Sequence, residues 1–117
     1  MSQTLFILND PPYGTERTYN GLRLARSLVK REGQTVKVFL MGDAASSAKV
    51  GQKVPTGYYK LDDILKMVAH HGAQIGVCGT CMDARGMGDP DLIEGAHRST
   101  MDELTDWTLW ADKILVF

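Results

Sequence analysis

The stretch Ala73-Gln74-Ile75-Gly76-Val77-Cys78-Gly79-Thr80-Cys81-Met82-Asp83-Ala84-Arg85-Gly86 joins a short apolar run to a turn that holds both cysteines of the chain. The apolar part, 73–77, predicts a buried strand, because it is short, apolar and bounded by glycine. A thiol at the carboxyl end of an internal strand lies where open α/β sheets expose reactive groups. The chain has no other cysteine, so a disulfide framework between distant segments is excluded.

Apolar runs alternate with amphipathic segments on both sides of this stretch. The expected strands are 4–8, 36–41, 73–77, 96–99 and 113–117. The expected helices are 16–32 with Thr15 as its cap and Gly33 as its end, a short helix capped by Asp43, one over 61–72, and a last one opened by Ser99. This alternation predicts right-handed βαβ units. We therefore expect a three-layer α/β/α fold with a mostly parallel sheet of about five strands, in a single domain over 1–117.

Composition narrows the class of protein. The 117 residues are 44% hydrophobic and 23% charged, and the formal net charge is −1, which argues against nucleic-acid binding through bulk electrostatics. No apolar run approaches the roughly 18 residues that span a bilayer. The first residues pass directly into a strand without a charged leader, so we expect a cytoplasmic protein. In a reducing compartment, a C-x-x-C motif is more often catalytic or metal-binding than structural.

A parallel sheet gathers the loops after its strands along one edge, and this places distant residues in one candidate site. The first loop supplies Asn9 and Tyr13, the second supplies Asp43 and Lys53, and the third supplies Cys78, Cys81, Asp83 and Arg85. The irregular segment 52–58 contains Pro55 and Gly57, and we expect it to form a mobile flap over the same edge.

Nucleophilic or sulfur-carrying chemistry is the leading interpretation of the cysteine turn. The thiolate is the nucleophile, and a free cysteine with a pKa of about 8.5 is mostly protonated at neutral pH. Backbone amides at the strand end, and a helix N-terminus if one forms there, favour the anion at Cys78. Arg85 would add positive charge and Asp83 would oppose it. We expect Cys78 to be the more reactive thiol because it lies at the strand end.

Other interpretations stay open. Both cysteines are inert small residues if the strand end is fully packed. A zinc site is disfavoured because zinc takes four ligands and only one C-x-x-C pair exists, so we expect neither metal nor cofactor. A thioredoxin-type dithiol needs a long helix after the motif, and the break at 86–90 comes too soon. A regulatory disulfide between Cys78 and Cys81 is compatible with the spacing.

The chain resembles the DsrE/DsrF-like proteins, and among them the small stand-alone YchN-like branch. The resemblance covers essentially the whole sequence, from Asn9-Asp10-Pro11-Pro12-Tyr13-Gly14 to Trp107-Thr108-Leu109. It includes Leu22-Arg23-Leu24-Ala25, the run from Phe39 to Ala44, Gly51-Gln52-Lys53 and the turn from Cys78 to Gly86.

This resemblance implies the same three-layer fold and compact homo- or hetero-oligomers, commonly trimers or hexamers. In sulfur-relay members, a cysteine after the third main strand carries a persulfide between a donor and an acceptor protein, and Cys78 matches that position. The relay subunits generally lack the second cysteine, so Cys81 departs from their pattern. The resulting hypothesis is a sulfur carrier in which Cys78 accepts sulfane sulfur and Cys81 resolves it. The alternatives are a non-enzymatic, oligomeric binding or redox-sensing protein and a small-molecule binder.

Overall fold

Five strands form one fully parallel sheet in the order β4-β3-β2-β1-β5. The computed structural model describes all 117 residues. Its strands are β1 (Ser2–Leu8), β2 (Gln34–Leu40), β3 (Gln74–Cys78), β4 (Ala96–Ser99) and β5 (Lys113–Val116). Its helical elements are α1 (Arg17–Val29), η1 (Gly42–Ala48), α2 (Leu61–His70), α3 (Gly79–Ala84), η2 (Asp89–Asp91) and α4 (Met101–Trp110).

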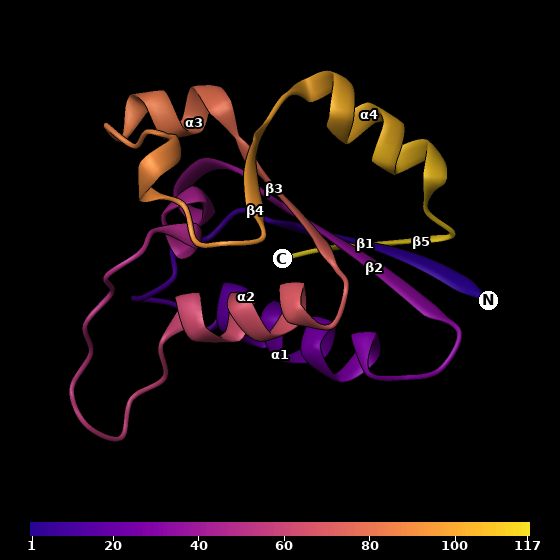
Figure 1. Ribbon diagram of the computed structural model, residues 1–117, viewed down its shortest axis with the longest axis horizontal. Helices are drawn as coiled ribbons and strands as arrows, with labels where there is room; N and C mark the ends of the chain where they lie inside the picture. The colour runs from indigo at the N-terminus through magenta and orange to yellow at the C-terminus, as the bar shows by residue number, and fades with distance from the viewer.

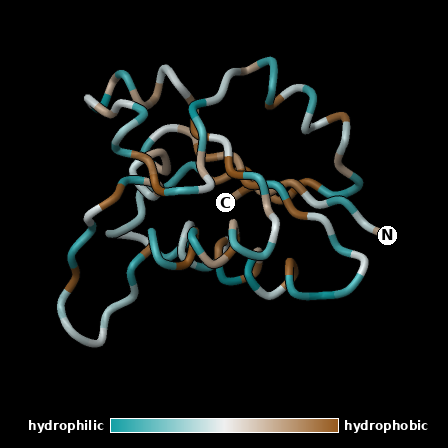
Figure 2. The backbone as a smooth tube through the Cα atoms, in the orientation of Figure 1, coloured by the Kyte–Doolittle hydropathy of each residue, from teal (hydrophilic) through white to brown (hydrophobic).

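The layers expected from the sequence are confirmed, but the two faces of the sheet are covered unequally. Helices α1 and α2 lie on one face and α4 lies on the other (Figure 1). Successive side chains along each strand point to opposite faces of the sheet. Phe6 therefore packs on the side of α1 and α2, and its neighbour Leu5 packs on the side of α4. Hydrophobic residues concentrate in the central strands, and the outer surfaces of the helices are mostly hydrophilic (Figure 2).

The larger core contains 20 buried residues, whereas the core under α4 contains four: Leu5, Phe39, Leu104 and Trp107. Trp107 packs directly onto β3, because a Cβ built at Gly76 would lie 3.1 Å from Cη2 of its indole ring. A side chain at Gly76 would therefore push α4 away from the sheet. The absence of a side chain at Gly76 thus makes room for the indole ring of Trp107 against β3.

Several predicted helix ends differ from the structure. Helix α1 begins at Arg17, and Thr15 lies before its N-cap position, accepting a 3.4 Å hydrogen bond from the Arg17 amide. The helix ends at Val29, earlier than predicted, because the chain turns toward Gly33, where φ is +77°. Asp43 lies inside η1, so the prediction that it caps that helix was wrong.

The start of α4 is also shifted. Its N-cap is Thr100, whose hydroxyl accepts a 3.2 Å hydrogen bond from the Glu103 amide, while Ser99 ends β4. No helix of the chain combines the length and the apolar composition that crossing a membrane requires.

Candidate functional site

Cys78 is both the last residue of β3 and the N-cap of α3. Its sulfur accepts a 3.4 Å hydrogen bond from the Cys81 amide and lies 3.4 Å from the Thr80 hydroxyl. The strand-to-helix junction predicted at this position therefore directs backbone and side-chain donors onto one thiol. Helix α3 is only six residues long and the chain turns at Gly86, where φ is +64°, so the long helix of a thioredoxin-type site is absent.

These donors shift the acidity of Cys78. Partial burial raises its pKa, but hydrogen bonds from the side chains and amides of Cys81 and Thr80 outweigh that effect, and the net pKa lies below the ordinary cysteine value. A hydrogen bond to the charged form stabilises that form, so the thiolate is favoured here without a neighbouring metal or histidine. Cys78 is thus the more acidic of the two thiols.

Cys81 is shifted in the opposite direction. Burial raises its pKa, and its hydrogen bond to Cys78 raises it further, despite the opposing effect of the Gly42 amide. That amide donates to the Cys81 sulfur at 3.2 Å and links α3 to the start of η1. The two thiols therefore differ in role at neutral pH, with Cys78 as the readier anion and Cys81 as its protonated hydrogen-bond donor.

Arg85 and Asp83 have partners that the sequence did not indicate. Arg85 Nη2 lies 2.6 Å from Asp43 Oδ1, and its Nη1 donates to the Cys81 carbonyl at 3.0 Å. Asp83 accepts two hydrogen bonds from Arg98, at 2.8 and 2.9 Å. Arg85 therefore links η1 to α3 through Asp43 and the Cys81 carbonyl. The negative charge of Asp83 is paired with the positive charge of Arg98.

Arg98 is a residue of this site that sequence reasoning missed. Its guanidinium lies over Gly79, where an added Cβ would be 2.9 Å from Nε and 3.0 Å from Cζ. Strand β4 pairs with β3 so that Cys78 aligns with Ser99, which places Arg98 one residue before the level of the thiol. The only sequence signal was the short predicted strand 96–99, and its register against β3 could not be inferred from its four residues.

A cavity of about 260 Å³ opens beside Cys78 on the α4 face of the sheet. Its wall combines apolar side chains from β2, polar groups from the ends of β3 and β4, and the beginning of α4. The lining residues are Phe39, Met41, Cys78, Gly79, Thr80, Arg98, Ser99, Thr100 and Met101. The cavity is thus partly apolar, and it presents one acidic thiol, hydroxyl groups and one guanidinium to a small ligand.

Of the predicted site residues only Cys78 lines this cavity, and three of the others lie away from the cysteine turn. The Asn9 side chain donates to the Phe117 carbonyl at 3.2 Å and so holds the end of the chain. Tyr13 donates to Gln52 at 2.5 Å and accepts from the Leu61 amide at 3.2 Å. Lys53 is exposed in the loop between η1 and α2. Of the predicted set, the structure brings together Cys78, Cys81, Asp43, Asp83 and Arg85.

The segment 52–58 belongs to a loop that extends beyond the body of the protein, beside the start of α2 (Figure 1). Its base is fixed, because the Gln52 side-chain amide donates to the carbonyls of residues 46, 47 and 49. Tyr59 stacks on Tyr19 of α1 with ring centroids 3.8 Å apart. The loop contributes no residue to the Cys78 cavity, and the mobility of its exposed tip stays a prediction.

No group of three or more His, Cys, Asp or Glu side chains lies close enough together to hold a metal ion. The site combines thiols, backbone amides and hydroxyls with two guanidinium–carboxylate pairs. These groups bind anions and support nucleophilic sulfur chemistry.

Comparison with known proteins places this arrangement in a family. The sequence model of the DsrE/DsrF-like family matches residues 2–117. The chain belongs to the DsrE/DsrF-like family. It is 37% identical to protein YchN of Escherichia coli strain K12 over 118 residues, which covers all of both chains. It is also 35% identical to the uncharacterized protein MK0008 of Methanopyrus kandleri, covering 95% of this chain and 90% of that protein.

Solved structures agree with this family assignment. The crystal structure of E. coli YchN superposes with a TM-score of 0.93 over the full length of both chains. MTH1491 from Methanobacterium thermoautotrophicum, a protein of unknown function, has a TM-score of 0.78 at 14% identity and covers 98% of this chain and 99% of its own. The second likeness shows the DsrE-like fold alone. The family is associated with sulfur relay, and the resemblance seen in the sequence is confirmed at the level of family and fold.

Proposed function

We propose that this protein accepts sulfane sulfur as a persulfide on Cys78 and passes it on. One observation carries the proposal: the Cys78 sulfur caps α3, receives hydrogen bonds from Cys81 and Thr80, has a lowered pKa and opens into a cavity. A thiolate with that access is the nucleophile that sulfur transfer requires.

The first step is an exchange at sulfur. The Cys78 thiolate attacks the outer sulfur of a donor persulfide R–S–SH, a new S–S bond forms, and the donor's S–S bond breaks. The products are Cys78–S–SH and the donor thiolate R–S⁻, so the sulfane sulfur moves without net oxidation or reduction. The Cys81 amide and the Thr80 hydroxyl stabilise the negative charge on the Cys78 sulfur, while the Arg98 guanidinium at the cavity wall is paired with Asp83.

The second step has two outcomes. A thiolate of an acceptor protein can remove the outer sulfur and restore Cys78. Alternatively, Cys81, once deprotonated, attacks the inner sulfur of Cys78–S–SH, which forms the Cys78–Cys81 disulfide and releases HS⁻. In that branch the two cysteines are oxidised by two electrons and the sulfane sulfur is reduced to sulfide, so the electrons balance. Burial raises the pKa of Cys81, so little of its thiolate is present at neutral pH and this branch is slow.

Intact-mass spectrometry tests the proposal. The protein is incubated with glutathione persulfide, desalted without reductant and mapped by peptide. We expect a gain of one sulfur atom, about 32 Da, on the Cys78 peptide, removable by dithiothreitol. Cys81→Ser should retain the adduct and extend its lifetime, whereas Cys78→Ser should lose it. An adduct confined to Cys81, or none on a protein whose thiols are free, contradicts the proposal.

A second function, redox sensing by the same pair, is favoured by the hydrogen bond between the two thiols. Thiols in side-chain contact need little movement to form a disulfide. Titration against glutathione redox buffers separates the two functions. A reversible disulfide without any persulfide adduct supports the sensor, and an adduct that transfers to an acceptor thiol supports the carrier.

We also propose that the chain self-associates through its α4 face, as a trimer or hexamer. That face has the smaller core and leaves Met101, Leu109 and Val116 exposed by 62%, 82% and 63%. Met101 also lines the Cys78 cavity. A second copy seated on this face would cover apolar surface and complete the wall of the cavity.

A further inference from the structure

Helix α1 and the two residues after it carry positive charge that the rest of the chain pairs only at Arg17, which lies 3.8 Å from Asp10. Residues 17–31 contain five of the 13 Lys and Arg and none of the 14 Asp and Glu. The rest of the chain then has eight basic and 14 acidic residues, a formal charge of −6. The small net charge of the whole protein therefore hides a strongly basic helix on an acidic body.

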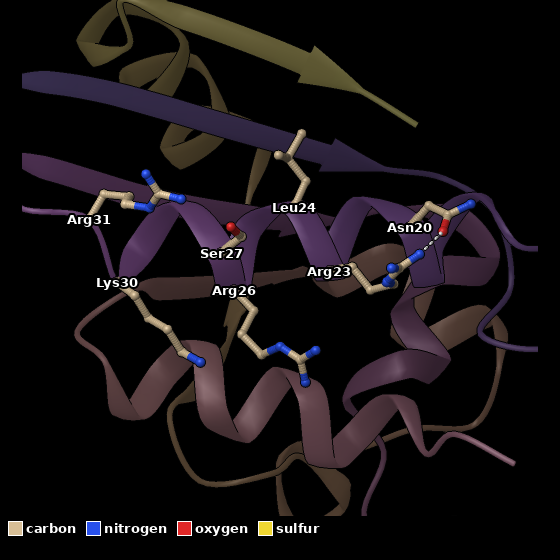
Figure 3. A pocket seen from close by; sticks show the side chains of 7 residues that line it. All are labelled: Asn20, Arg23, Leu24, Arg26, Ser27, Lys30 and Arg31. Atoms are coloured by element: carbon tan, nitrogen blue, oxygen red, sulfur yellow. Dashed lines mark hydrogen bonds between the residues drawn. The ribbon is translucent and has the colours of Figure 1, made fainter. Parts of the chain in front are cut away.

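The basic side chains of α1 border a shallow groove of about 680 Å³, which we call the α1 groove. Its lining residues are Asn20, Arg23, Leu24, Arg26, Ser27, Lys30 and Arg31. Arg26 and Lys30 point toward α2, while Leu24 and Arg31 point toward the strands, with the small Ser27 between them (Figure 3). The groove thus runs between two rows of long side chains along the exposed surface of the helix.

The cations of the groove have no acidic partners. None of Arg26, Lys30 and Arg31 forms an ion pair, and Arg23 donates only to the neutral Asn20 at 3.2 Å. Arg26 and Lys30 are four residues apart, a spacing at which like charges destabilise a helix. Cations are favourable in the last turn of a helix, but that effect does not reach Arg23 in its middle. The unpaired cations therefore lower the stability of the helix to some extent. Charges that are retained at such a cost are typical of a binding surface.

The dimensions and the charge of the groove favour one kind of occupant. From Arg23 to the end of α1 at Val29 the helix rises about 9 Å, the length of one or two helical turns of a bound segment. Leu24, 44% exposed, offers one apolar contact among the cations. A long nucleic acid would extend past this short patch onto a body with a formal charge of −6. A short acidic segment with an apolar side chain matches both the cations and Leu24.

We propose that the α1 groove is a docking surface for an acidic segment of a partner protein, in which two or three carboxylates surround one apolar side chain. The groove lies on the opposite face of the sheet from the Cys78 cavity. A partner bound there would leave the thiol accessible. The proposal is independent of the proposed sulfur chemistry, because it rests on α1 alone.

Fluorescence anisotropy with the full chain tests the proposal. The probe is a short fluorescein-labelled peptide in which Glu and Asp surround Leu, and a fluorescein-labelled oligothymidylate serves as the nucleic-acid probe. We expect the peptide to bind in low salt and to dissociate as salt screens the charges. The triple variant R26Q/K30Q/R31Q should weaken binding about tenfold. The control variant K49Q/K53Q/K66Q removes the same charge from outside the groove and should bind as the wild type does.

Leu24→Ala should weaken binding of the Leu-containing peptide but not of the same peptide with Gln in place of Leu. Equal loss of binding in the triple variant and its control overturns the proposal, as does tighter binding of the oligothymidylate than of the peptide. Dissociation of an oligomer in the triple variant alone would also overturn it, because the groove would then be a contact between copies of this chain.

Discussion

Replacement of Thr80 by valine tests whether hydrogen bonds set the reactivity of Cys78. Valine keeps the branched shape of threonine and removes the hydroxyl that lies 3.4 Å from the Cys78 sulfur. The hydroxyl donates to the thiolate, so its loss raises the pKa of Cys78 relative to the wild type. Less thiolate is then present at neutral pH, and alkylation of Cys78 should slow.

The expected size of the effect follows from the geometry. A single hydrogen bond contributes about 1 kcal/mol, which corresponds to about a fivefold change in an equilibrium constant. Thr80 is exposed, so water replaces part of the lost bond. We therefore expect alkylation of Cys78 at pH 7 to be about threefold slower in Thr80→Val, with the difference vanishing at a pH well above the pKa of both forms.

The assay is iodoacetamide labelling at limiting reagent, followed by peptide mapping at a series of pH values. Thr80→Ser keeps the hydroxyl and should label at the rate of the wild type. If Thr80→Val reacts as fast as Thr80→Ser at pH 7, the hydroxyl does not stabilise the thiolate. If the valine variant is slower by the same factor at every pH, the methyl group obstructs access and the reasoning from acidity is wrong.

Three further predictions concern packing, pH dependence and assembly. Gly76→Ala should lower the free energy of unfolding by about 1–3 kcal/mol in urea titrations, because its methyl group would meet Trp107; an unchanged midpoint would refute that contact. Burial raises the pKa of Glu103, but hydrogen bonds from Ser99 and His97 lower it below the ordinary value, so this carboxylate stabilises the fold above a pH of about 4.3 and loses that effect as pH falls through its folded pKa. Glu103→Gln should therefore reduce the loss of stability between pH 5 and pH 3, and an identical pH profile would contradict the assignment. Sedimentation at micromolar concentration should show an oligomer that dissociates in a variant with Glu on the exposed face of α4; a wild-type monomer would refute self-association through that face.

Much of the fold could be predicted because its signals are local. The predicted strands 36–41 and 73–77, with the amphipathic helix 61–72 between them, define a βαβ unit without tertiary information. The helix ends were less predictable, since Ser99 and Thr100 are both good N-caps and the choice between them depends on where β4 ends. Because Ser99 pairs with Cys78 of β3, it belongs to β4, and Thr100 becomes the N-cap. Strand pairing depends on residues far apart in the sequence, so the local pattern does not predict it.

The sequence predicted the position of the cysteine turn and the amides that favour the anion at Cys78, but not the ion pairs around them. The sequence placed Cys78 and Cys81 at the carboxyl edge of the sheet, and the structure has them there. Which cation faces which carboxylate depends on the relative placement of η1, α3 and β4, and no local pattern encodes it. For this reason the sequence predicts that Arg85 adds positive charge beside Cys78, whereas its guanidinium pairs with Asp43. The sequence also gives no indication of Arg98, whose guanidinium lies over Gly79.

Burial raises the pKa of both cysteines, and their different hydrogen-bond roles in the turn then separate the two pKa values. Cys78 is the N-cap and accepts hydrogen bonds from the first turn of α3, whereas Cys81 lies within that turn and donates to Cys78. The Gly42 amide donates to the Cys81 sulfur at 3.2 Å and lowers the pKa of Cys81, which partly offsets the effects that raise it. The first turn of α3 thus lowers the pKa of Cys78, whereas burial and the hydrogen bond to Cys78 raise that of Cys81. In the proposed sulfur carrier this difference sets the order of the two steps: Cys78 would attack the donor first, and Cys81 would resolve the persulfide only after losing its proton.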